Sequence, residues 1–321
     1  MKYRQLGRTG LKVSEVGFGS WAIGGTSYGP TKDEDSLAAL ETAWERGVNF
    51  YDTADTYGHG HSEELLARFL KGKPRDKIVI ASKAGWDFYH GGSKKNFDSD
   101  YLRFACGESL KRLGVGSVDL YQLHNPPLEL IKEGRIVGVL EELKKQGKIR
   151  FIGISIHLES EALAAMEDPR VDTLQVIFNL IDQRMAVNVF PAAREKNIGI
   201  IAREPLYCGL LTGKYKPGHE FSRDDHRRRW SKEKLELDFQ KIERLKKVLV
   251  TERLSLSRAA LEYILDFDAV ATVIPGIKTR AQAIENIAAS DDPRLRIEEA
   301  SLLRELYNRD EIFRKGFFRE S

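Results

Sequence analysis

Four residues that could cooperate in acid–base chemistry follow short apolar segments of this chain. Asp52 lies at the end of the segment NFYDTA, and Tyr57 follows it in a loop that ends at Gly58. Lys83 ends the segment IVIASK, and His124 ends DLYQLH. Burying a charged aspartate at the end of a strand costs free energy unless a cation pairs with it. We therefore expect Lys83 to pair with Asp52.

This set of side chains is suited to proton transfer. A buried ammonium favours the phenolate, so Lys83 is expected to lower the pKa of Tyr57 from its ordinary value of about 10. Asp52 would keep the lysine charged and oriented, and His124 would donate to a substrate oxygen or relay a proton. A core ion pair is the structural alternative for Asp52 and Lys83. The tyrosine and histidine at matching strand ends favour a catalytic site.

The spacing of the strand ends predicts the architecture that positions these residues. A fourth apolar segment, IRFIGIS, ends in Ser155, so strand ends fall at positions 52, 83, 124 and 155, separated by 31, 41 and 31 residues. Such intervals suit one βα unit each. Helical apolar patterns between them stop at glycines, namely Gly47, Gly72, Gly114 and Gly147. With GFGSW, TLQVIFN, NIGIIARE and AVATVIPG as further strands, the sequence predicts a (β/α)₈ TIM barrel.

The two ends of the chain have their own patterns. Residues 2 to 16 alternate around the turn Gly7-Arg8-Thr9-Gly10, which predicts a β-hairpin. The tail SLLRELYNRDEIFRKGFF predicts a C-terminal helix, with Phe317 and Phe318 covering the barrel or an interface. Because barrels with insertions reach this length, residues 1–321 are expected to form a single domain.

The ordered motifs YDTADTYG, ASKAG and LYQLH resemble those of the aldo-keto reductases. The resemblance extends from LGRTGLKVSEVGFGSW to IPGIKTRAQAIEN, nearly the whole chain. It implies a barrel with an N-terminal hairpin at its bottom and Asp52, Tyr57, Lys83 and His124 as the catalytic residues. The implied activity is NADPH-dependent reduction of an aldehyde or ketone to an alcohol, with hydride from nicotinamide and Tyr57 as general acid.

The resemblance and the residue types together predict a set of binding residues. Trp21, Tyr57, Trp86 and His124 are expected at the substrate. Lys278 and Arg280 supply cations suited to a 2′-phosphate, so NADP(H) is expected in preference to NAD(H). The residues expected to bind the cofactor are Ser20, Trp21, Asp52, Ser155, Gln175, Arg203, Glu204, Pro205, Leu206, Lys214, Gly276, Lys278, Arg280, Gln282, Glu285 and Asn286. No GxGxxG follows a strand, so the cofactor would not bind as in a Rossmann fold.

The sequence departs from the family pattern at the expected nicotinamide. Ser155 and Gln175 match residues that bind the carboxamide, but Ile156 occupies a position where many members have Asn or Arg. Arg203 stands where an aromatic residue commonly stacks on the ring. A guanidinium can also stack, and an unneutralised cation there would favour the reduced, uncharged nicotinamide unless Glu204 compensates.

Other features are interpreted as structural. His59 and His61 lack the spacing of a zinc helix, so no metal is expected, and Ser62 is expected to cap the following helix. The run Arg227-Arg228-Arg229 is interpreted as surface. Two cysteines, Cys106 and Cys208, are too few for a disulfide framework and are expected to be buried.

Composition excludes several classes of protein. A net charge of +3 is too small for a nucleic-acid or membrane-surface footprint, and no apolar run can cross a bilayer, so a cytoplasmic protein is expected. Its partner would be a small carbonyl substrate; which one, and the oligomeric state, stay open. One alternative is an NADPH-sensing regulatory subunit similar to the potassium-channel β subunits. His124 argues against this alternative, because those subunits have Asn at the corresponding position. The other is a phosphate-binding barrel isomerase.

Overall fold

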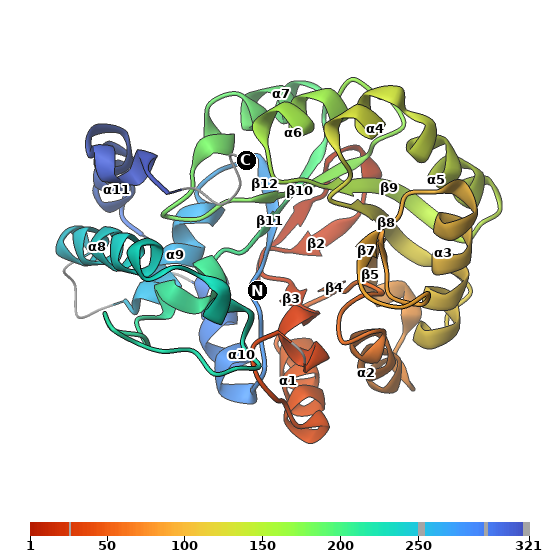
Figure 1. Ribbon diagram of the computed structural model, residues 1–321, viewed down its shortest axis with the longest axis horizontal. Coiled ribbons are helices and arrows are strands. Elements are labelled where there is room, and N and C mark those ends of the chain that lie inside the picture. The colour runs from red at the N-terminus through yellow and green to blue at the C-terminus, as the bar shows by residue number, and fades with distance from the viewer. Residues whose placement is uncertain (26, 250–253, 292–294, 317–321) are drawn as a thin grey trace.

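Eight parallel strands form one sheet around the centre of the molecule (Figure 1). The structure is a computed structural model that describes residues 1–25, 27–249, 254–291 and 295–316, so Phe317 and Phe318 lie outside the described residues. In sheet order the strands are β12 (Val270–Ile274), β11 (Gly199–Arg203), β10 (Thr173–Ile177), β9 (Ile149–Ser155), β8 (Val118–His124), β5 (Val79–Ala84), β4 (Phe50–Asp52) and β3 (Phe18–Gly19).

The first and last strands of this sheet meet, which brings the sheet to a nearly closed barrel. Val16 and Gly19 form parallel bridges with Val273 and Gly276. The Gly17 amide donates to the Val273 carbonyl at 2.8 Å. This contact confirms the predicted (β/α)₈ TIM barrel, whose strand ends converge at one mouth.

Helices surround the strands (Figure 1). The predicted glycine stops are observed; Gly114, for example, follows its helix with the left-handed φ of 65° that a C-terminal cap requires. The helices are α1 (Asp33–Glu45), α2 (His61–Leu70), α3 (Ser99–Leu113), α4 (Leu128–Glu133), α5 (Arg135–Lys145), α6 (Glu159–Ala165), α7 (Val189–Glu195), α8 (Lys232–Val248), α9 (Leu256–Leu265), α10 (Arg280–Ile287) and α11 (Ile297–Arg309). None of them is long and apolar enough to cross a membrane among the residues described.

Two hairpins lie outside the barrel sheet. The predicted N-terminal hairpin is confirmed as β1 (Tyr3–Gln5) and β2 (Lys12–Ser14). Its turn packs on the start of β11, where Leu6 leaves no room for a side chain at Gly199. The second hairpin, β6 (Trp86–Asp87) and β7 (Lys94–Lys95), directly follows β5 at the opposite end of the barrel.

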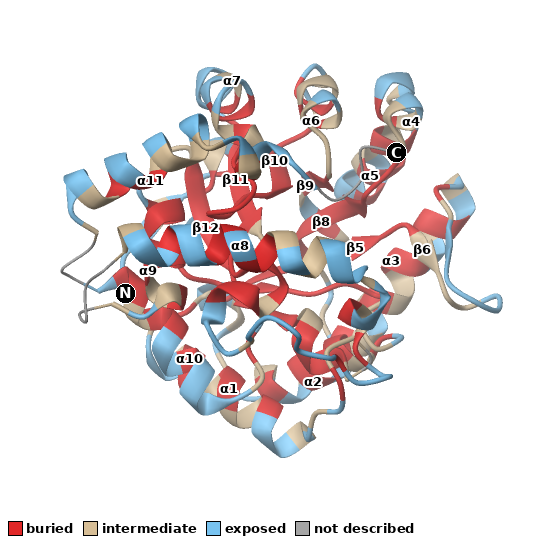
Figure 2. Ribbon diagram, turned by 60° about the vertical axis from the view of Figure 1, so that its left-hand side comes forward, coloured by how far each residue is buried: buried red, intermediate tan, exposed pale blue. Residues whose placement is uncertain are grey.

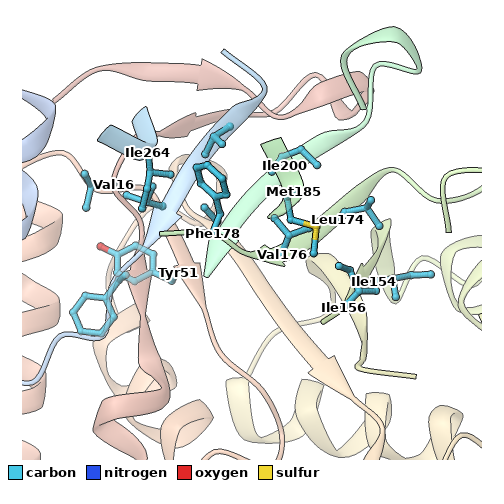
Figure 3. Close-up of a cluster of buried hydrophobic side chains, with 14 of the residues drawn as sticks. Val16, Tyr51, Ile154, Ile156, Leu174, Val176, Phe178, Met185, Ile200 and Ile264 are labelled. Atoms are coloured by element: carbon cyan, nitrogen blue, oxygen red, sulfur yellow. The ribbon is translucent and has the colours of Figure 1, made fainter. Parts of the chain in front are cut away.

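Alternation along each strand divides the core into two layers. Tyr51, Leu174 and Val176 point outward into a large apolar cluster between the strands and the helices (Figure 3). Phe50 and Leu120 belong instead to a smaller cluster that also contains Leu6 and Val13 of the hairpin. In Figure 2 the buried residues gather on the strands and on the inner faces of the helices. Because of the same alternation, inward-facing side chains near the carboxyl end of each strand lie close to the mouth of the barrel.

Candidate active site

Asp52, Lys83 and Tyr57 form one connected group at the carboxyl ends of β4 and β5. The Lys83 ammonium is fully buried and donates to Asp52 Oδ1 at 2.6 Å and to the Thr53 carbonyl at 2.8 Å. It also lies 3.3 Å from the Tyr57 hydroxyl. The structure therefore brings together the carboxylate, the amine and the phenol that the sequence separates.

Two buried amides hold the other side of the Asp52 carboxylate. Gln175 and Gln122 donate to Asp52 Oδ2 at 2.7 and 3.2 Å. Gln175 was expected to bind the nicotinamide carboxamide, but in this structure its amide nitrogen is engaged by Asp52. Gln122 is not among the residues predicted for the site. The sequence could have identified it, because it lies two positions before His124 on β8 and its side chain therefore faces the same side of the strand.

Burial outweighs the lysine in its effect on Tyr57. Burial raises the pKa of Tyr57, and the neighbouring Lys83 charge opposes this increase only in part. Burial would lower the pKa of Lys83, but Asp52 and Tyr57 more than reverse that effect and raise it. The expected lowering of the Tyr57 pKa is thus wrong for this structure. Tyr57 is a protonated donor beside a charged lysine.

His124 lies across from the tyrosine. The two rings meet edge to face, with centroids 5.9 Å apart. Burial, assisted by the positive charges of Lys83 and Arg203, holds the pKa of His124 well below its usual range. Its Nδ1 atom is buried without a hydrogen-bond partner among the described residues. His124 is therefore a neutral imidazole that can donate one hydrogen bond.

The backbone of the loop that carries Tyr57 packs directly against the backbone at Gly24, and this contact fixes the path of the loop. Gly58 has a φ of 62°, and a Cβ atom there would lie 2.1 Å from the Gly24 carbonyl oxygen. Only glycine fits at such a contact. The Tyr57 loop is thereby docked on the segment Ser20–Gly24, which also carries Trp21, and the Trp21 and Tyr57 rings stack with centroids 6.1 Å apart.

A cavity of about 240 Å³ extends from this group along the mouth of the barrel. Its lining includes Tyr57, Asp52 and Lys278. The predicted residues that line it are Trp21, Asp52, Tyr57, Gln175, Arg203, Glu204, Pro205, Leu206, Lys214, Gly276, Lys278 and Gln282. The predicted residues outside its lining are Ser20, Trp86, Lys83, His124, Ser155, Arg280, Glu285 and Asn286.

Arg203 is paired rather than unneutralised. Its guanidinium donates to Glu204 at 2.6 Å and to the Ile156 carbonyl at 3.2 Å, and it lies 2.7 Å from His157 Nδ1. The condition for a bias toward reduced nicotinamide, an uncompensated cation, is therefore not met. Glu204 reaches this pairing with a left-handed φ of 54°, a conformation that costs about 1–3 kcal/mol.

Arg227 is buried, which corrects the interpretation of the arginine run as surface. Its side chain lines the cavity, binds Asp225 at 2.6 Å and donates to the Cys208 carbonyl at 2.9 Å. It also packs over the ring of Tyr28, with 5.1 Å from its guanidinium carbon to the ring centroid. Arg228 and Arg229 are exposed as expected. Tyr28, Cys208 and Tyr215 line the cavity although the sequence interpretation did not include them.

Several of the residues expected to bind the phosphates and the adenine lie between Lys278 and the end of α10. The Lys278 ammonium donates to the Tyr28 carbonyl at 2.6 Å, and Gln282 accepts from the Lys278 amide at 2.8 Å. Arg280 is exposed in the first turn of α10. Glu285 is engaged by Ser257 and Ser255 of the α9 region, and Asn286 is buried.

Three remaining predicted positions are buried or lie on the neighbouring hairpin. Ser155 donates to Asn125 at 3.2 Å, and Asn125 has a left-handed φ of 59° directly after His124. The Ser20 hydroxyl is buried without a hydrogen-bond partner among the described residues. Trp86 lies on β6, beside the mouth.

The histidine loop shows no metal-binding arrangement. The His61 Nε2 atom lies 2.9 Å from Asp33. Among the residues described, no cluster of three or more His, Cys, Asp or Glu side chains could hold a metal ion. The expected cap is wrong, because α2 begins at His61 after Gly60, and Ser62 instead bonds Thr53 at 2.9 Å. Cys106 and Cys208 are buried and free, as expected.

Comparison with known proteins identifies the family. Residues 15–308 match the model of the aldo/keto reductase family. An aldo-keto reductase of Schizosaccharomyces pombe named with NADP(+) is 33% identical over 86% of this chain and 84% of its own. An NADH-specific methylglyoxal reductase of Escherichia coli is 29% identical over 95% of this chain and 98% of its own.

A solved structure agrees with this assignment. The holo form of aldo-keto reductase AKR11C1 from Bacillus halodurans superposes with a TM-score of 0.81 at 29% identity, covering 95% of this chain and 96% of that one. The chain described here belongs to the aldo-keto reductase family. It is therefore an oxidoreductase of a family that acts on small carbonyl compounds and uses nicotinamide cofactors.

Proposed function

We propose that the protein reduces an aldehyde or ketone to an alcohol with NADPH, and that Tyr57 is the general acid. One observation carries this proposal: the buried Lys83 ammonium contacts both the Asp52 carboxylate and the Tyr57 hydroxyl where strand ends border the cavity. Proton donors placed in this way are typical of catalytic sites rather than of core ion pairs.

The residues along the cavity fit a dinucleotide. Its lining offers Trp21 and the paired Arg203 for the nicotinamide, and it offers the cations Lys214 and Lys278 for the phosphates. The planar ring surface of Trp21 and the guanidinium plane of Arg203 suit stacking. When bound, the reduced nicotinamide supplies a hydride to the carbonyl carbon.

The protein's own residues move the proton. Tyr57 donates its hydroxyl proton to the carbonyl oxygen as negative charge develops there. Lys83, 3.3 Å away, stabilises the phenolate that is left, and Asp52 keeps the lysine charged. His124 contributes a hydrogen bond from a neutral imidazole to the same oxygen, which stabilises the developing charge.

The preference for NADPH over NADH is part of this proposal. One relative is named with NADP(+) and another is named NADH-specific, so family membership does not decide it. Lys278 lines the cavity, and Arg280 follows on α10. The 2′-phosphate, which NADPH has and NADH lacks, would form charge-assisted hydrogen bonds with these two cations. We therefore expect the KM for NADPH to be lower than the KM for NADH. Arg280→Ala should reduce the difference between these two KM values.

The test is a panel of aldehydes and ketones, with nucleotide oxidation followed by absorbance. Tyr57→Phe removes the proton but keeps the ring, and we expect kcat to fall at least about 10²-fold, the contribution of a general acid. Nucleotide binding should persist in this variant. Binding of NADPH without turnover of any carbonyl by the wild type would instead support the regulatory-subunit alternative.

A further inference from the structure

Gln122 lies in the same inward-facing layer of the barrel as Asp52 and Lys83. On β8 it comes two positions after Leu120, a member of the smaller apolar cluster, and it is the cross-strand neighbour of Lys83 on β5. Alternation therefore directs its side chain into the barrel, closer to the mouth than Leu120. Gln122 is fully buried. Because burying an amide without hydrogen-bond partners costs free energy, its partners define its role.

The amide of Gln122 has two partners that together fix its orientation. Its Nε2 atom donates to Asp52 Oδ2 at 3.2 Å, and its Oε1 atom accepts from Gln175 Nε2 at 3.4 Å. Gln175 Nε2 also donates to Asp52 Oδ2, at 2.7 Å. An ionised carboxylate only accepts hydrogen bonds, so an amide turned the other way would place its oxygen against Asp52. The three side chains therefore hold one another in one arrangement.

A missing side chain on β9 lets Gln122 reach these partners. Gly153 is the cross-strand neighbour of Gln122 on one side and of Thr173 on the other. A Cβ atom at Gly153 would lie 2.9 Å from Gln122 Cγ and 2.5 Å from Thr173 Oγ1. A glycine inside a strand is typical of such a close approach. It leaves open the space through which Gln122 extends toward Gln175.

The carboxylate that Gln122 contacts determines where Lys83 lies. The three N–H donors of the Lys83 ammonium match three acceptors. These are Asp52 Oδ1 at 2.6 Å, the Thr53 carbonyl at 2.8 Å and the Tyr57 hydroxyl at 3.3 Å. The contact with Tyr57 is the longest, so it is the first to be lost if Asp52 rotates and Lys83 follows it. Holding Asp52 Oδ2 therefore keeps Lys83 at Tyr57.

We propose that Gln122 is a positioning residue for carbonyl reduction, which fixes the Asp52 carboxylate and thereby holds the Lys83 ammonium at Tyr57. This inference rests on the proposed reductase function. Gln175 lines the cavity, so a bound nucleotide can draw its amide away from Asp52, whereas Gln122 is outside the lining. Gln122 is then the donor that stays on Asp52 Oδ2, and it acts through Asp52 rather than on the substrate.

The first test is Gln122→Met, which keeps the length of the side chain and removes both hydrogen bonds. We expect kcat to fall about tenfold, the scale of one hydrogen bond to a charged group, while the KM values for NADPH and an aldehyde stay within about twofold. Fluorescence titration with NADPH counts the folded molecules. Gln146→Met, at an exposed position that ends α5, is the control and should behave as the wild type. An unchanged kcat, or a loss confined to KM, would overturn the positioning role.

Gly153→Ala tests the same contact from the neighbouring strand. The added Cβ should displace Gln122, so kcat should again fall with little change in KM. Combined with Gln122→Met, it should cost no more than about a further twofold, because both changes break one contact. Gly107→Ala is the control, since nothing lies within 4 Å of a Cβ atom at that position in α3. Fully additive losses for Gly153→Ala and Gln122→Met would contradict the proposal.

The positioning role and the reductase function fail in different ways. Turnover of a carbonyl by the wild type that is lost in Tyr57→Phe supports the function whatever Gln122 does. A cycle of Gln122→Met and Asp52→Asn, measured by urea unfolding, needs no turnover. The shifts in the unfolding midpoint should be smaller together than their sum, because Gln122 has no buried charge to compensate once Asp52 is an amide. Additive shifts would overturn the positioning role alone.

Discussion

At the scale of single residues, the site depends on ionisable side chains held away from water. Asp52 accepts hydrogen bonds from Lys83, Gln122 and Gln175, so its buried charge is compensated on both oxygens. Such compensation makes a buried carboxylate tolerable. Burial also keeps Tyr57 protonated and His124 neutral. The chemistry thus follows from depth in the barrel as much as from the residue types.

The pH dependence of reduction should lack a histidine transition. An ordinary histidine titrates near pH 6.5, but burial and the charge of Lys83 hold the pKa of His124 well below that value. His124 is therefore already neutral above about pH 6, and kcat/KM should not change through His124 between about pH 6 and 8. A pH profile of the wild type and of His124→Gln checks this. A step near pH 6.5 that is present only in the wild type would contradict it.

Asp55 should make the fold less stable as pH rises. Asp55 is fully buried, and this burial, with repulsion from Glu63, raises the pKa of its carboxyl group well above the ordinary value. The folded state therefore keeps a proton that the unfolded chain releases above about pH 4. This contribution to stability declines by about 1.4 kcal/mol per pH unit until the folded pKa is reached.

Asp55→Asn should remove that decline. The neutral amide has nearly the same shape, so the free energy of unfolding should fall less steeply between about pH 5 and 8 than in the wild type. Urea unfolding at several pH values measures the slope. Asp76→Asn, an exposed position, is the control and should keep the wild-type slope. Parallel slopes for Asp55→Asn and the wild type would show that Asp55 is ionised in the folded protein.

At the scale of elements, the segment after β11 builds one wall of the cavity from strained backbone. Glu204, Tyr207 and Cys208 all have left-handed φ values between 47° and 54°. Such conformations persist only where surrounding contacts fix them. Arg227 supplies one of those contacts by donating to the Cys208 carbonyl, and its guanidinium is itself held by Asp225 and Tyr215. The wall therefore depends on a cation located far along the loop.

Arg227→Gln should weaken nucleotide binding. The change leaves the buried Asp225 without its bidentate partner and releases the Cys208 carbonyl, so we expect the Kd for NADPH to rise about tenfold or more. Fluorescence titration with NADPH measures the change. Arg228→Gln, at the adjacent exposed position, should bind NADPH as the wild type does. Equal affinities for the two variants would indicate that Arg227 does not support the cavity wall.

At the scale of the whole molecule, the two ends of the barrel have different tasks. The mouth carries the candidate active site, while the N-terminal hairpin packs at the opposite end. Arg4 fastens this hairpin, donating to Glu15 at 2.7 Å and to the carbonyls of Phe267 and Val270 at 3.1 and 2.9 Å. The separation predicts that stability and catalysis can be changed independently.

Arg4→Met should lower stability without affecting catalysis. Loss of these charge-assisted bonds should reduce the free energy of unfolding by about 2–3 kcal/mol. The KM values for NADPH and for an aldehyde should stay within about twofold of the wild type, because the hairpin is remote from the mouth. Chemical denaturation and steady-state kinetics provide the two readouts. Lys12→Met, an exposed change on the same hairpin, should leave both unchanged.

The sequence by itself determined the barrel and the heart of the candidate site. Parallel strands of a barrel all end at one mouth, and alternation along a strand repeats every two residues. Strand endings in Asp52, Lys83 and His124 therefore sufficed to predict side chains that converge. The turn at Gly58 then brings Tyr57 to Lys83.

Only the tertiary structure decided how the loops close around that site. Arg203 is neutralised by Glu204. Arg227 is buried against Tyr28, which lies 199 positions earlier in the sequence. Irregular loops have no period from which the direction of a side chain can be predicted. Whether a cation there is solvated or buried depends on long-range contacts between loops, and those contacts exist only once the barrel has brought the loops together.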